Sequence, residues 1–203
     1  MEKASRFPER NIRFIDTGYN TLFTIPDGAS ITLTRFDGKE ETFPCRYIDD
    51  AHFEAFHSAY HIFQFAETME RNGNTYRPEQ PRPGDVLDTY EIYQLKDAIN
   101  TAYGLMPYDC AKGKIRPEHY QRTYTGVLAP KVTVEDLCRK HGQNSRPLGS
   151  QKRPLLASDV VVLNRSGERR AFYLNAIGFT ECKEFLKPPR RTRSARKPRN
   201  PER

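Results

Sequence analysis

The strongest constraint on the fold is the uninterrupted apolar run VVVL at residues 160–163. Four apolar residues in a row, three of them β-branched, are typical of a central strand that is buried on both faces. A turn sequence, RSGE, follows at 165–168, and a second strand-like segment comes after it. We therefore predict two consecutive strands within residues 155–186, the first of them in the interior of a sheet.

Residues 11–49 carry a second group of strand signals. Short apolar alternations are separated by turn sequences, and the Asp-Gly pairs at 27–28 and 37–38 favour hairpin turns. Asp49 or Asp50 can cap a following helix.

We expect this helix to start near His52 and to run to about Arg71, because the Asn-Gly pair at 72–73 is a good helix end. Residues 74–85 then contain three prolines and no periodicity, which predicts a linker.

The second half of the chain contains further recognisable elements. A strand is predicted over 88–95, and a strand-like segment over 120–128. Residues 133–142 read as a helix, which Thr133 can cap while Asp136 completes a capping box. Together these signals predict an α+β fold.

We expect five segments along the chain: a flexible N-terminus (1–8), a small strand–helix module (9–73), a Pro-rich linker (74–85), a mixed α+β domain (86–186) and a disordered Arg-rich tail (187–203).

Charge is distributed unevenly between the body and this tail. The chain has 33 Lys and Arg and 26 Asp and Glu, and residues 187–203 hold eight of the former and one of the latter. The body is therefore formally neutral, and the basic excess lies in the tail. Such an arm can contact phosphates in a salt-dependent way, so we expect nucleic acid to be bound by the tail. The residues expected to do so are Arg190, Arg191, Arg193, Arg196, Lys197 and Arg199.

His57 and His61 are the most conspicuous candidates for chemistry. Four residues apart on a helix, they share one face, and Phe65 lies one turn further on that face. Glu54 could add a ligand, but a zinc site needs three or four, and Ser58 stands where the HExxH motif requires glutamate. We expect no metal and no cofactor, and we interpret His57, His61 and Phe65 as a surface that binds a protein partner.

The four cysteines are Cys45, Cys110, Cys138 and Cys182, and none forms a CxxC pair. No apolar run is long enough to span a membrane, and residues 1–14 lack the apolar core of a secretory signal. We therefore expect a cytoplasmic protein with reduced, mostly buried thiols.

Cys138 lies three residues before His141, and we expect it to fill the core side of its helix rather than to act as a nucleophile. Cys110 follows Asp109 and precedes Lys112, whose charge could lower the pKa of the thiol. A single unpaired cysteine in a polar loop is only weak evidence for catalysis.

Two segments resemble known modules. The sequence YIDD with FAETMERNG, within 43–79, resembles a small module of large polyvalent proteins in mobile elements of Firmicutes. The sequences YEIYQLK, DLCRKHGQNSRP, SDVVVL and GFTECKEFL, within 86–186, resemble YodL-like domains of the same elements.

This resemblance implies an accessory protein of a conjugative element or phage. We expect it to be non-enzymatic and to bind a host or element protein or nucleoprotein, for example as an inhibitor of a restriction or CRISPR nuclease. The alternative is an enzyme, a nuclease or thiol hydrolase, that uses His57 and His61 or Cys110.

Overall fold

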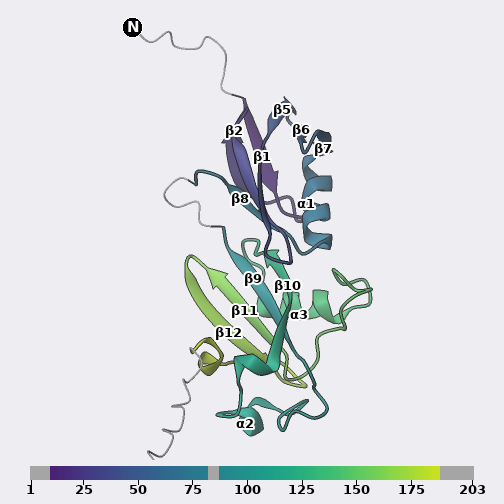
Figure 1. Cartoon of the computed structure of the whole chain (residues 1–203), viewed down its shortest axis with the longest axis vertical. Helices are drawn as coiled ribbons and strands as arrows, with labels where there is room; N and C mark the ends of the chain where they lie inside the picture. Colours follow the sequence, from purple (N-terminus) through teal and green to yellow (C-terminus); the bar gives the residue numbers. More distant parts are fainter. Residues whose placement is uncertain (1–9, 82–86, 188–203) are drawn as a thin grey trace, which may run out of the picture.

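The computed structural model describes residues 10–81 and 87–187. Within these ranges strands predominate and helices are few, so the predicted α+β class holds as a mixed but mainly β fold. Figure 1 shows two parts stacked along the long axis, an N-terminal module with helix α1 (Ile62–Arg71) and a C-terminal domain with helix α3 (Val134–Gly142). Among the described residues, no helix combines the length and apolarity needed to cross a bilayer.

The N-terminal module consists of three small antiparallel sheets and α1 around one apolar core. Its strands are β1 (Asn11–Ile15), β2 (Thr21–Pro26), β3 (Ser30–Thr34), β4 (Glu40–Pro44), β5 (Arg46–Asp49), β6 (His52–Ala55), β7 (Ser58–His61) and β8 (Thr75–Pro78). β1 pairs with β2, β3 lies between β4 and β8, and β6 lies between β5 and β7. Aromatic rings fill the core, where Phe14 stacks on Phe23 at 4.7 Å and meets Phe65 edge-on at 5.6 Å between ring centroids.

The prediction of one helix from about His52 is wrong for residues 52–61, which form β6 and β7. Phe56 and His57 have positive φ angles of 52° and 60° and make the two-residue turn between these paired strands. The apolar spacing here fits both a helix and a strand, and a short run cannot separate the two periods. The hydrogen-bonded pairing of β6 with β5 favours the strand conformation over the helix.

The caps of α1 differ from the prediction at its start and agree at its end. Asp49 caps no helix, since its carboxylate accepts hydrogen bonds from the Ala51 amide and from Nδ1 of His52, both at 2.8 Å. The cap is His61, whose Nδ1 accepts the Phe63 N–H at 3.1 Å. The predicted helix end at 72–73 is confirmed.

Of the two predicted hairpins in the module, only one forms. The turn at 37–38 joins β3 and β4, which are paired. The turn at 27–28 joins β2 and β3, which belong to different sheets. That hairpin prediction is wrong, because turn residues fix a change of direction but not the strand that the chain then joins.

The predicted linker over 74–85 contains a strand. β8 pairs with β3, with Tyr76 opposite Leu33, and the ring of Tyr76 is buried in the core of the module. Prolines at the end of an edge strand do not prevent this pairing, since an edge residue has a free side. Residues 82–86 lie outside the described residues.

The C-terminal domain is built on one antiparallel sheet of five strands. They are β9 (Thr89–Leu95), β10 (Tyr120–Val127), β11 (Val160–Arg165), β12 (Glu168–Leu174) and β13 (Phe179–Glu181), in the order β10-β9-β11-β12-β13. The short helix α2 (Tyr108–Ala111) and the 3₁₀ turns η1 (Pro117–His119) and η2 (Lys183–Leu186) complete the domain.

Strand β11 occupies the middle of this sheet, as its sequence predicts. Val160 and Val162 face one apolar cluster and Val161 the other, and all three are at most 1 % exposed. The other strands predicted for this domain and the capping box of α3 at Thr133 and Asp136 are also confirmed.

The predicted flexible N-terminus and nearly all of the predicted Arg-rich tail, including its phosphate-contact residues, lie outside the described residues.

Candidate functional site

The predicted stripe of His57, His61 and Phe65 is not a common surface. His57 is exposed in the turn between β6 and β7, and His61 is partly buried as the cap of α1. Phe65 is 1 % exposed and packs against Phe14 and Tyr60, so its assignment to an exposed surface is wrong. The stripe required one continuous helix, and the strand pairing removes it.

Sequence reasoning missed a different pair of imidazoles in this region. Cross-strand pairing sets His52 opposite His61, and their rings meet edge-on at 5.2 Å between centroids. In the ranges that the structure describes, no three His, Cys, Asp or Glu side chains are grouped as metal ligands would be.

Three of the four cysteines lie where burial opposes formation of the thiolate. Burial raises the pKa of Cys45 to about 12 and the pKa values of Cys138 and Cys182 to about 11. Cys110 is exposed on α2. The predicted packing of Cys138 on the core side of α3 agrees with its partial burial.

His141, three residues after Cys138, lies inside the C-terminal domain. It is 4 % exposed, its Nε2 lies 3.0 Å from the Tyr90 hydroxyl, and its ring centroid lies 4.6 Å from that of Tyr124. Burial lowers the pKa of His141 to about 3, so the imidazole is neutral at physiological pH. The signal in the sequence is its spacing, because Val134, Leu137 and His141 share the buried face of α3.

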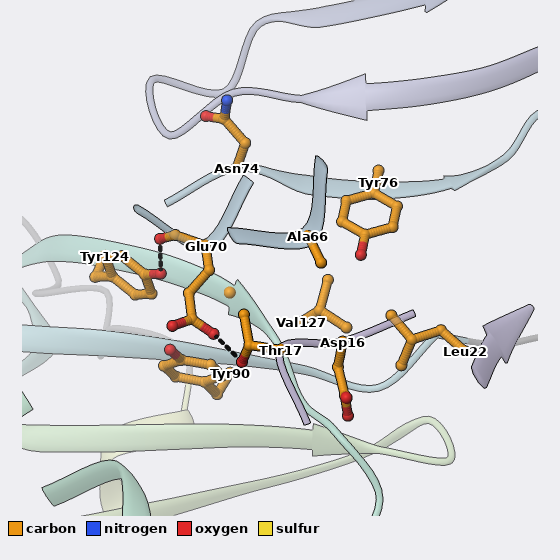
Figure 2. A pocket seen from close by; sticks show the side chains of 11 residues that line it. Asp16, Thr17, Leu22, Ala66, Glu70, Asn74, Tyr76, Tyr90, Tyr124 and Val127 are labelled. Atoms are coloured by element: carbon orange, nitrogen blue, oxygen red, sulfur yellow. Dashed lines mark hydrogen bonds between the residues drawn. The ribbon is translucent and has the colours of Figure 1, made fainter. Parts of the chain in front are cut away.

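The two parts of the molecule meet where the C-terminal end of α1 contacts β10 (Figure 2). The Tyr124 hydroxyl donates to the carbonyl oxygen of Glu70, and the Thr125 hydroxyl donates to that of Gly73 at 2.9 Å. The Glu70 carboxylate accepts the Thr17 hydroxyl at 3.0 Å and pairs with Lys140 of α3 at 2.6 Å. We call these contacts the junction.

A cavity of about 290 Å³ opens beside the junction, between the turn that joins β1 to β2 and helix α3. Its acidic lining residues are already engaged within the protein. Asp16 accepts the Gly18 and Asn20 amides at 2.8 Å, and Asp136 forms the capping box. Asp16 and Asp136 thus stabilise their own turn and helix cap, while Glu70 and Lys140, which also line the cavity, pair across the junction.

The opposite end of the C-terminal domain exposes apolar side chains. We call this surface the apolar end; it consists of Leu105, Met106, Leu156 and Ile177, of which Ile177 is 94 % exposed and the others 42–52 % exposed. Leu105 has a φ angle of 59°, in the left-handed region that a leucine rarely adopts.

Partly buried hydrogen bonds hold the backbone of the apolar end. The Leu105 N–H donates to the Ser158 hydroxyl at 2.9 Å, and the Tyr173 hydroxyl donates to the Met106 carbonyl at 2.8 Å. Asn175, in the loop that carries Ile177, accepts the Tyr108 N–H at 2.8 Å. The backbone that carries Leu105, Met106 and Ile177 is thus tied by hydrogen bonds to neighbouring segments of the domain.

The loop that carries Leu156 is anchored by an ion pair. The carboxylate of Asp159 is fully buried and forms two bonds of 2.7 Å with the guanidinium of Arg153. It also accepts the Leu156 N–H at 2.9 Å. Burial raises the pKa of Asp159, while the hydrogen bonds and charge of Arg153 act in the opposite direction.

Residues 89–185 match the family model of the YodL-like domain. The chain therefore contains a YodL-like domain, and this part of the predicted resemblance is confirmed. Comparison with curated proteins and with solved structures gives no significant match. The resemblance of the N-terminal module, and an origin in mobile elements of Firmicutes, stay predictions.

The structure explains what several residues of the YodL-like sequence patterns do. Ser158 and Asp159 of SDVVVL hold the apolar end, and Gln94 of YEIYQLK donates to the carbonyl oxygen of Arg153 at 3.0 Å. Arg146, the arginine of the Arg-Pro pair, donates to the carbonyl oxygens of Gly149 and Lys152. These pattern residues support loops, and the exposed side chains that the loops present lie outside the patterns.

Proposed function

We propose that this chain is a non-enzymatic binding protein and that it contacts an apolar segment of a protein partner through the apolar end. The observation that carries this proposal is the exposed, left-handed Leu105, fixed by Ser158. A leucine in this conformation costs the fold about 1–2 kcal/mol. Strain of this kind is concentrated at functional surfaces, and exposed apolar groups are typical of interaction sites.

The junction supports this function, because it joins the N-terminal module to the domain that carries the apolar end. The turn between β6 and β7, which bears His57, lies at the other end of the molecule (Figure 1). The predicted contact of His57 with a partner can then act as a second contact, separate from the apolar end.

The YodL-like domain supports a role in a mobile genetic element. We infer that the protein is a cytoplasmic accessory factor of a conjugative element or phage, and that its partner is a host or element protein or nucleoprotein. A restriction or CRISPR nuclease is the candidate partner that fits this context. The proposal rests on the kind of elements in which such domains occur, together with the apolar end.

A crosslinking experiment tests the apolar end directly. A photoreactive amino acid at position 177, which is almost fully exposed, should crosslink to the partner in host cells, and the same group at position 57 is the matched control. The partner, once identified and purified, should bind the Leu105→Asn/Ile177→Ser variant at least tenfold more weakly than the unaltered chain. An affinity within twofold of the unaltered value would refute the proposal.

An assay of turnover separates this proposal from the enzyme alternative. With the identified partner or a nucleic acid as substrate, we expect no product that depends on His57, His61 or Cys110. Product formed by the unaltered chain and lost in His57→Ala or Cys110→Ser would establish the alternative.

A further inference from the structure

We propose that the start of helix α1 is a pH-sensitive switch, in which protonation of His61 removes the cap of the helix and the first turn of α1 opens. The switch lies in the N-terminal module, where the sheet of β5, β6 and β7 leads into α1 (Figure 1). It does not involve the apolar end, so this inference does not depend on the protein partner proposed above.

The cap of α1 requires a neutral imidazole. Nδ1 of His61 accepts the Phe63 N–H at 3.1 Å, and this bond needs a lone pair on that nitrogen. In the imidazolium both ring nitrogens carry a proton, and neither can accept a hydrogen bond. Serine, threonine and asparagine, which commonly cap helices, keep their acceptor oxygen in acid. Histidine is the side chain that gains a proton between pH 8 and 5, so a histidine cap is lost in this range.

A positive charge at this position is also unfavourable for the helix itself. The free N–H groups of the first turn give the N-terminus of a helix a partial positive charge. The first turn of α1 contains no acidic residue that could compensate an imidazolium at His61. Loss of the hydrogen bond and electrostatic repulsion therefore both favour opening of the first turn at low pH.

The residue that faces His61 across the sheet adds to this effect. His52 lies opposite His61 in the pairing of β6 with β7, and the ring centroids are 5.2 Å apart. Nδ1 of His52 lies 2.8 Å from the carboxylate of Asp49, so His52 is held in place when it is protonated. Like charges directly opposite each other on two strands repel. A protonated His52 therefore disfavours a protonated His61 in the capping position.

The other charged and titratable groups of this sheet give His61 no counter-charge in ion-pair contact. They are Arg46, Tyr47, Asp49, Asp50, Glu54, His57 and Tyr60. Arg46 lies opposite Glu54 in the pairing of β5 with β6. Among the described residues, His52 forms an ion pair with a carboxylate and His61 does not. The imidazole that caps α1 is thus the one without a carboxylate to stabilise its charged form.

The first turn of α1 carries an aromatic contact that reports its opening. Phe63 belongs to this turn, and its ring stacks on that of Tyr19 at 4.8 Å between centroids. Tyr19 is 63 % exposed and lies in the turn that joins β1 to β2. Opening of the first turn separates the two rings and exposes Phe63 in acid. The C-terminal end of α1 is held by the contacts of the junction and should stay in place.

NMR spectroscopy of the full chain from pH 8 to 5 tests the switch, because it reports on a single turn of a single helix in the folded state. Carbon-13 shifts of the imidazole rings follow proton binding, and Cα shifts of residues 62–65 follow the helix. We expect these Cα shifts to lose helical character as His61 binds its proton. The population of the open turn should rise about fivefold, the usual effect of removing a helix cap. The Cα shifts of residues 68–71 should not change.

Two substitutions at position 61 form a matched pair. His61→Asn keeps an acceptor at every pH, so its first turn should stay helical at pH 5. His61→Ala has no acceptor, so its first turn should be open to the same extent at pH 8 and at pH 5. His57→Gln removes an exposed imidazole of the same hairpin and should keep the acid response of the unaltered chain.

Three results would overturn the inference. In the unaltered chain, His61 binds no proton between pH 8 and 5, or it binds one while residues 62–65 keep their helical shifts. The third is an acid response in His61→Asn equal to that of the unaltered chain. Thermal unfolding at pH 8 checks that each variant is folded, and the titration of the unaltered chain decides the question without any variant.

Discussion

The hydroxyl of Tyr90 lies 3.0 Å from Nε2 of His141, and the two side chains connect the sheet of the C-terminal domain to α3 in its interior. Lys140, the residue before His141, reaches outward to Glu70 at the junction. One turn of α3 thus contributes both to the core of the domain and to the attachment of the N-terminal module.

Acid should weaken the fold through His141. Its pKa is about 3 in the folded chain, below the ordinary value of 6.5, so between these pH values the unfolded chain binds a proton that the folded chain does not. The free energy of unfolding therefore falls as the pH falls through this window, by up to about 1.4 kcal/mol per pH unit. Urea unfolding of the unaltered chain and of His141→Gln from pH 4 to 8 measures it. Parallel profiles for the two chains would show that His141 is not responsible.

Breaking the ion pair of Arg153 and Asp159 should strongly destabilise the fold. Arg153→Met leaves the buried carboxylate without its cation, and we expect a loss of about 3 kcal/mol in the free energy of unfolding at pH 7. Asp159→Asn added to Arg153→Met should recover part of the loss, because no charge is then buried. Arg170→Met, which removes a partly exposed pair with Glu181, is the control and should cost less than about 1 kcal/mol. The free energies of unfolding are measured by chemical denaturation. Equal losses for Arg153→Met and Arg170→Met would contradict a special role of the buried pair.

Gly73 should be required for the close approach of the two parts. Its φ is +65°, and an added Cβ would lie 3.1 Å from ring atoms of Tyr124. Gly38, with φ +89° and nothing within 4 Å of an added Cβ, is the matched control. Gly38→Ala should cost about 1 kcal/mol for the backbone alone, and Gly73→Ala about 1 kcal/mol more. The difference is measured by urea unfolding, and no difference would mean that the ring of Tyr124 moves aside freely.

Leu105 should behave unlike a core leucine. Because it is 52 % exposed and left-handed, Leu105→Asn should leave the free energy of unfolding unchanged or raise it by up to about 1 kcal/mol. The contrast is Leu137→Ala, which removes a buried side chain and should cost about 2–5 kcal/mol. Thermal unfolding of both variants tests this expectation. A large decrease in the free energy of unfolding for Leu105→Asn would show that the Leu105 side chain stabilises the fold and is not kept for binding.

Much of the C-terminal domain could be predicted from the sequence, because its signals are local. The apolar run at 160–163 predicts a strand that is buried on both faces, and Thr133 with Asp136 marks the start of α3. Neighbouring residues carry these signals, so they act before any tertiary contact forms.

The candidate sites were less accessible to sequence reasoning. The spacing of His57 and His61 predicts one helical face, but β6 pairs with both β5 and β7, so that the segment is a hairpin. The apolar end joins residues from three loops, so no single window of sequence contains it.

The sequence alone determined the turns at 27–28, 37–38 and 165–168, where α3 begins and ends, and that one strand must lie inside a sheet. Propensity, capping and apolar runs depend on adjacent residues. Only the tertiary structure decided between helix and strand at 52–61, buried Phe65 and His141, and set Arg122 and Arg169 beside Glu91. These outcomes depend on partners that are distant along the chain, and the energy of pairing and burial outweighs the weaker local preferences.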